Sequence, residues 1–166
     1  MKIGAFFTAI LAGLIFWGSA WAQNKNLDIA LTPIANTKTD WEFRLSGKLN
    51  FNPEDGIVIQ IPGEMMIVPI SVSVNGKKMW MQNLLTVPEK DSVIAWQIVP
   101  EGLMLLFKRG LIRQGDQLNL LCIANLLKKD LTNKTVYLKK IVSKPDGLKV
   151  STQPLASGTI PSIPNR

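Results

Sequence analysis

The chain has 166 residues, with 19 Lys or Arg against 12 Asp or Glu, a formal net charge of +7 and a single cysteine. It contains no histidine, which excludes His-based acid–base triads and removes the commonest metal ligand. One cysteine cannot form an internal disulfide, so stability must come from apolar burial, which a chain of this length allows.

The first 22 residues have the pattern of a signal peptide. Lys2 precedes an uncharged apolar run from Ile3 to Trp17, and Ala20-Trp21-Ala22 places small residues at the two positions that a signal peptidase reads. We predict cleavage after Ala22 and therefore an extracytoplasmic protein in the periplasm, on the cell surface or secreted. A retained anchor is the alternative, because roughly 20 uncharged residues could just span a bilayer, and this would be the chain's contact with a membrane.

The next segments alternate apolar and polar residues, as half-buried strands do. Residues 27–31 form such a strand, which stops at Pro33, and residues 41–46 give the clearest one-sided strand of the chain. Trp41 lies on the apolar side of this strand and is placed in the core. Residues 52–56 combine Asn, Pro, Asp and Gly, which predicts a turn.

A β-hairpin is predicted around Asn75-Gly76, because both turn positions tolerate positive φ. The strand 70–74 precedes it, and the segment after it begins with two adjacent lysines, which are typical of an edge strand that leaves its apolar side chains to a chosen partner. Met residues next to a Trp are typical of protein interfaces. The alternative is that the Trp is simply buried in the core. The interface candidates are Lys77, Lys78, Met79, Trp80 and Met81.

Two more strands, 93–99 and 103–107, follow, and Trp96 alternates with apolar neighbours as a core residue would. A Gly-flanked basic connection then leads on through residues 108–115. This loop could bind an anionic polymer. The alternative is that it is a solvated connection without a binding role. Its basic candidates are Lys108, Arg109 and Arg113.

The stretch Gly115 to Asn125 is interpreted as the central strand of the fold. It opens with a turn dipeptide, alternates apolar with polar residues and then becomes apolar on both sides, as a strand between two layers would. An amphipathic helix is the alternative, because Leu118, Leu121 and Cys122 also follow helical spacing. In either structure Cys122 is a small buried hydrophobe and not a reactive group.

The end of the chain contains one more strand, 135–142, and a turn at Asp146-Gly147. Asn133-Lys134-Thr135 fits a glycosylation acceptor, which matters only in a eukaryotic host. Residues 153–166 are rich in Pro, Ser and Gly and are predicted to be a flexible tail. The folded domain is therefore expected to span residues 23–152.

So many short strands separated by turn residues predict an all-β fold, an immunoglobulin-like Greek-key sandwich of about seven to nine strands. Four segments together resemble the immunoglobulin-like modules of bacterial surface and S-layer-type proteins. The resemblance implies a spacer, adhesion or assembly unit that is not catalytic, although the chain shows a single copy of the module. The four segments are Phe51 to Pro62, Val72 to Gly76, Gln114 to Leu120 and Thr135 to Leu138.

No catalytic or cofactor-binding motif is visible. Glu54-Asp55 and the pair Glu89 and Asp91 are expected to be solvated turn residues, and neither a phosphate-binding loop nor a Gly-x-Ser-x-Gly elbow is present. We therefore predict a non-catalytic envelope module without metal or cofactor. Its partner is an envelope protein or an anionic envelope polymer and not nucleic acid. The alternative is a carbohydrate-binding or carbohydrate-active protein that uses exposed Trp residues.

Overall fold

The computed structural model of the chain describes residues 27–37, 39–84, 93–127 and 131–162, so the predicted signal segment lies outside the described residues. These residues form eleven strands and no helix, which confirms the all-β prediction. No membrane-spanning helix is found in this part of the chain. The strands are β1 Asp28–Pro33, β2 Asp40–Lys48, β3 Gly56–Gln60, β4 Met65–Val74, β5 Lys77–Asn83, β6 Val93–Val99, β7 Gly102–Leu106, β8 Gln117–Leu126, β9 Thr135–Lys144, β10 Gly147–Val150 and β11 Ala156–Thr159.

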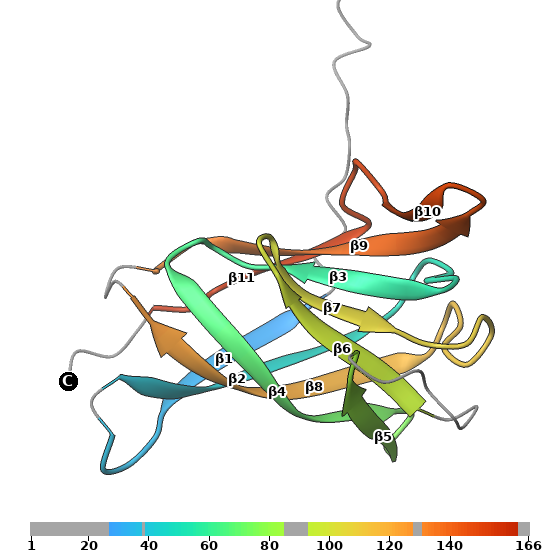
Figure 1. Cartoon of the computed structure of the whole chain (residues 1–166). Helices are drawn as coiled ribbons and strands as arrows, with labels where there is room; N and C mark the ends of the chain where they lie inside the picture. Colours follow the sequence, from blue (N-terminus) through green and yellow to red (C-terminus); the bar gives the residue numbers. More distant parts are fainter. Residues whose placement is uncertain (1–26, 38, 85–92, 128–130, 163–166) are drawn as a thin grey trace, which may run out of the picture.

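The strands belong to one curled mixed sheet that forms a half-barrel, so the predicted immunoglobulin-like sandwich of two separate sheets is not confirmed (Figure 1). The order is β1-β2-β8-β4-β5-β6-β7-β3-β9-β10, and β11 also pairs with β9. The sheet continues around its corner because β5 changes partner along its length. Its first residues pair with β4 up to Met79, and from Trp80 onwards it pairs in parallel with β6. The expected edge strand at 77–82 is therefore an interior strand.

The core fills the inside of the half-barrel. Trp41 is buried as predicted, and Trp96 is half-buried and packs against the core. Alternation accounts for this packing, because every second residue of a strand turns its side chain to the same side. The largest fully buried side chains include Phe43, Leu45, Ile57, Ile59, Ile67, Leu103, Leu105 and Leu118.

The stretch interpreted as the central strand is a strand and not a helix. It forms β8, which pairs with β2 on one side and β4 on the other. Cys122 is fully buried between these neighbours, and burial raises the pKa of its thiol to about 12. The structural role predicted for this cysteine agrees with that environment.

A β-bulge in β4 changes which residues face the core. Met65, Ile67 and Pro69 are buried before the bulge, and Val72 is buried after it, so the inward positions change from odd to even numbers. The register shift lies between Pro69 and Ser71, where Ile70 is the extra residue. A bulge also explains why a proline is tolerated in an interior strand.

The hairpin predicted at Asn75-Gly76 is present, with φ of 51° and 78° at the two turn residues. The Asn75 side chain donates to Asp116 Oδ1 at 2.8 Å and accepts from the backbone N–H of Gln117 at 2.8 Å. The hydrogen bond from Asn75, together with the backbone N–H of Arg113, lowers the pKa of Asp116. The hairpin is thereby fixed to the start of β8.

Part of the predicted flexible tail, 153–166, is folded. Residues 156–159 form β11, which pairs with β9, and Ile160 is completely buried. A Cβ on Gly158 would lie 2.5 Å from the carbonyl oxygen of Leu27, so β11 packs closely against the chain at β1. The small residues that made this segment look flexible are the ones that permit this approach.

Candidate functional site

Two neighbouring interior strands, β4 and β8, contain no charged residue, although each is ten residues long. One side of each strand is buried in the core, and the other side faces solvent. The outward side chains of Met66, Val68, Ile70 and Ile123 are 50, 43, 49 and 41% exposed. Contiguous apolar surface of this kind marks interaction sites in soluble domains.

The register brings these side chains together. Val68 is paired with Ile123, and Ser71 is paired with the half-buried Leu121. The bulge adds Ile70 beside Ser71 on the same side, since a bulge turns two successive side chains in one direction. We name this surface the β4–β8 face and define it by Met66, Val68, Ile70, Leu121 and Ile123.

Trp80 lies at the β5 side of this face. It is one position beyond Met79, which pairs with Val72, and it is 75% exposed. Met79 points into the core, so alternation along the strand turns Trp80 outward, one position past the last residue of β5 that pairs with β4. The indole therefore extends the apolar surface by one strand.

The other side of the β4–β8 face is bordered by β2. Arg44 is paired with Leu121 and lies outward with its side chain 66% exposed. Its Nε donates to Glu42 Oε1 at 2.6 Å. Next to Leu121 and Ile123, this border therefore carries one ion pair of opposite charges, which adds no net charge there.

The predicted interface residues do not form one surface. Lys77, Lys78 and Trp80 are exposed, and Met81 is half-buried against the core. Met79 is buried and belongs to the core, because it alternates with Trp80 and pairs with a core residue. It therefore cannot contact a partner in this structure. The sequence interpretation also missed the β4–β8 face, for which the signal was the absence of charge from residues 65–74 and 117–126.

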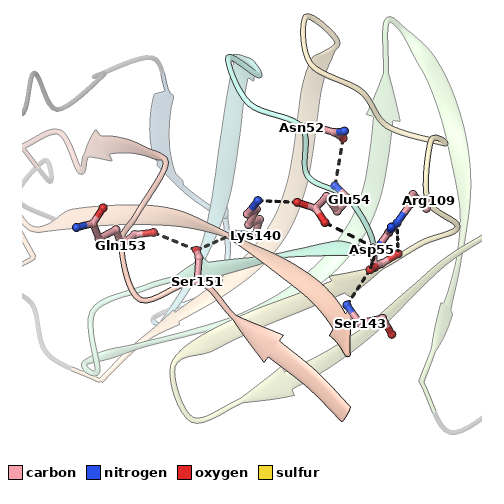
Figure 2. A network of polar contacts seen from close by, with 8 residues as sticks. All are labelled: Asn52, Glu54, Asp55, Arg109, Lys140, Ser143, Ser151 and Gln153. Carbon is pink, nitrogen blue, oxygen red and sulfur yellow. Dashed lines mark hydrogen bonds and ion pairs between the residues drawn. The ribbon is translucent and has the colours of Figure 1, made fainter. Parts of the chain in front are cut away.

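The predicted basic loop is tied to the rest of the fold. Arg109 donates from Nε and a terminal nitrogen to the two carboxylate oxygens of Asp55, at 3.0 and 2.7 Å (Figure 2). Arg113 donates to the carbonyl of Gly110 at 2.9 Å, and Lys108 is exposed. Much of this loop's hydrogen-bonding capacity is thus used within the protein.

Glu54 and Asp55 lie at a turn as expected, but they are half-buried and paired within the fold rather than freely solvated. Glu54 forms an ion pair with Lys140, and Asp55 also accepts from the backbone N–H of Ser143 at 2.8 Å (Figure 2). The hydrogen bonds from Arg109 and then Ser143 lower the pKa of Asp55, and the Asp55 carboxylate raises the pKa of Arg109. This network joins the turn before β3, the loop after β7 and the strand β9.

The described residues offer no group of three or more His, Cys, Asp or Glu that could hold a metal ion, and Glu89 and Asp91 lie outside them. A shallow groove of about 280 Å³ lies at the outer surface of β3, β7 and β9. Val58 and Met104 give it an apolar lining, with Glu101 and Lys139 also present. Ser151 and Thr152 also line the groove, and the Ser151 hydroxyl donates to the carbonyl of Gln153 at 3.0 Å.

No protein-family model matches the chain, and no curated protein matches it. Among solved structures, the collagen-binding domain of the surface protein RspB from Erysipelothrix rhusiopathiae is similar, with 12% identity and a TM-score of 0.40. The match covers 82% of this chain and 45% of that one, so the chain spans less than half the length of that structure. At this level the likeness is loose.

Proposed function

We propose that this protein is an exported, non-catalytic β-domain that acts as a binding, adhesion or assembly module at the cell envelope. The observation that carries the proposal is the β4–β8 face with Trp80 beside it. Depletion of charge, with Trp and Met present, is the composition of the core of a protein interface. An interior pair of strands normally has polar residues on its solvent side, so a partner that covers this face accounts for its sequence.

The test is the retention of the full-length chain in the envelope of the cells that produce it. Val68→Lys introduces a charge into the middle of the face, and Leu148→Lys is the matched control. Leu148 is 49% exposed on β10. We expect Val68→Lys to move the protein from the envelope-bound to the soluble fraction, by about tenfold if binding weakens by about 1.4 kcal/mol.

The control should keep the parental distribution. Thermal unfolding of both variants should be unchanged, because an exposed substitution rarely alters stability by more than about 0.5 kcal/mol. Equal envelope retention of the parent and Val68→Lys would contradict the proposed role of this face.

A carbohydrate-binding function is the second candidate, and the exposed indole of Trp80 favours it. Aromatic rings stack on sugar faces, but a sugar platform usually needs more than one exposed ring. Of the Trp residues in the described ranges, Trp41 is buried and Trp96 half-buried. Glycan-array binding that is lost in Trp80→Ala and kept in Val68→Lys would favour this candidate.

A further inference from the structure

We propose that the partner covering the β4–β8 face is a second copy of this chain, in a face-to-face pair related by a two-fold axis. This inference rests on the proposed function and names the partner of the same surface, so envelope retention then depends on assembly into the two-copy form. Its basis is the arrangement of side chains across four neighbouring strands.

These side chains form one row on the outward side of the sheet. Register pairing places Arg44 of β2 beside Leu121 of β8, and Leu121 beside Ser71 of β4. Trp80 of β5 follows, one position beyond the last β4–β5 pair. The row thus has a guanidinium at one end, an indole at the other and uncharged residues between them.

A two-fold axis that runs between β4 and β8, parallel to the strands, exchanges the two ends of the row. It places β8 of one copy over β4 of the other, and β2 over β5. Trp80 then faces Arg44 of the partner subunit, and the same contact occurs twice. Facing sheets pack about 10 Å apart, and Trp and Arg side chains are long enough to meet across that spacing.

The chemistry of this contact is favourable at both ends of the row. A guanidinium over the face of Trp is a favourable cation–π pair, because Trp is the best of the aromatic rings for this contact. Glu42 holds the Arg44 side chain at 2.6 Å and balances its charge. The centre of the row carries no charge, so pairing two copies desolvates no isolated ion there.

A lipid surface fits the same face less well. Binding to an anionic membrane depends on cations grouped around the apolar surface. Here the exposed lysines Lys77 and Lys78 lie on the β5 side, whereas on the β2 side Arg44 is paired with Glu42 and Lys48 lies at the far end of the strand, opposite Gln117. Val68, Ile70 and Ile123 are β-branched residues, which suit packing against another pleated sheet.

The test is sedimentation equilibrium of the protein purified from cells that express the whole chain. A concentration series from roughly 0.1 to 100 μM brackets common dimer affinities. We expect a monomer–dimer equilibrium whose Kd rises at least about 100-fold in Val68→Lys, which buries an unpaired charge, and stays unchanged in Leu148→Lys.

A double-mutant cycle tests the contact across the axis. Trp80→Ala should raise the dimer Kd by about 30-fold, as expected for a hot spot, and Arg44→Ala by about threefold, as expected for an exposed cation–π pair. The double variant should be no weaker than Trp80→Ala, because the contact is already lost there. Full additivity of the two effects would overturn the assigned contact.

A monomer at every concentration, or a dimer that Val68→Lys leaves intact, would overturn the two-fold pair. The protein could also co-sediment with phosphatidylglycerol vesicles in a salt-sensitive way. Loss of this binding in Val68→Lys would assign the face to lipid and would also overturn the two-fold pair. If the protein is monomeric but Val68→Lys still loses envelope retention, the proposed function stands with a different partner. If neither measurement responds, both proposals fail.

Discussion

Two exposed regions of this molecule differ in how their charges are used. Around Asp55 and Arg109, a charged turn and a basic loop are joined by paired hydrogen bonds and ion pairs. On the β4–β8 face, no charge is present, and the side chains of Met66, Val68, Ile70 and Ile123 are 41 to 50% exposed. Charged side chains in a loop can thus be engaged in hydrogen bonds and ion pairs within the protein. An uncharged pair of strands, by contrast, leaves an apolar surface exposed.

Within β8, Leu120 and Ile123 lie on opposite sides of one strand, so the buried core and the exposed face can be compared directly. Leu120→Ala should lower the free energy of unfolding by about 2–5 kcal/mol, because its side chain is 2% exposed and would leave a cavity. Ile123→Ala should cost about 1 kcal/mol or less, since Ile123 is 41% exposed. Urea unfolding measures both, and equal losses would contradict the orientation of β8.

Both regions lie on the same curled sheet. Its strand β11 was not predicted, because residues 153–166 were expected to be a flexible tail. Gly158→Val should lower the free energy of unfolding by about 1–3 kcal/mol, because its Cβ would lie 2.5 Å from the Leu27 carbonyl oxygen. Gly63→Ala is the control, since no atom lies within 4 Å of a Cβ at Gly63. A Gly158→Val protein as stable as the control would show that β11 does not pack there.

The smallest expected effect concerns the charged region and depends on pH. The folded pKa of Asp55 lies below its ordinary value of 3.8, so its contribution to stability is fully present above that value. It is lost as the pH falls through the lowered pKa. At neutral pH, Asp55→Asn should therefore have a lower free energy of unfolding than the parent. The loss should be smaller than the losses expected for Leu120→Ala and Gly158→Val.

The difference between Asp55→Asn and the parent should shrink as the pH falls below 3.8, which acid titration of chemical unfolding would detect. A difference that is constant from pH 7 to pH 2 would mean that the Asp55 carboxylate does not provide the stabilisation. The control is Asp28→Asn at an exposed position of β1, which should match the stability of the parent at neutral pH.

The all-β class and many of the local strands and turns follow from the sequence alone. Alternation placed β1, β2 and β8, because a strand with one buried side must repeat apolar residues at every second position. Asn75-Gly76 specified its hairpin, because few other residues adopt positive φ at both turn positions. Burial of Trp41 and Cys122 followed from the same alternation.

Only the tertiary structure decided which strands meet and which surfaces stay open. Hydrogen-bond partners of a strand are not encoded in its own alternation, so the change of partner along β5, which makes one sheet out of two expected layers, was not predictable. The folding of residues 156–160 depends on the close approach of Leu27, which is distant in sequence. Arg109 is paired and Trp80 exposed for the same reason: the availability of a side chain depends on neighbours that the fold brings to it.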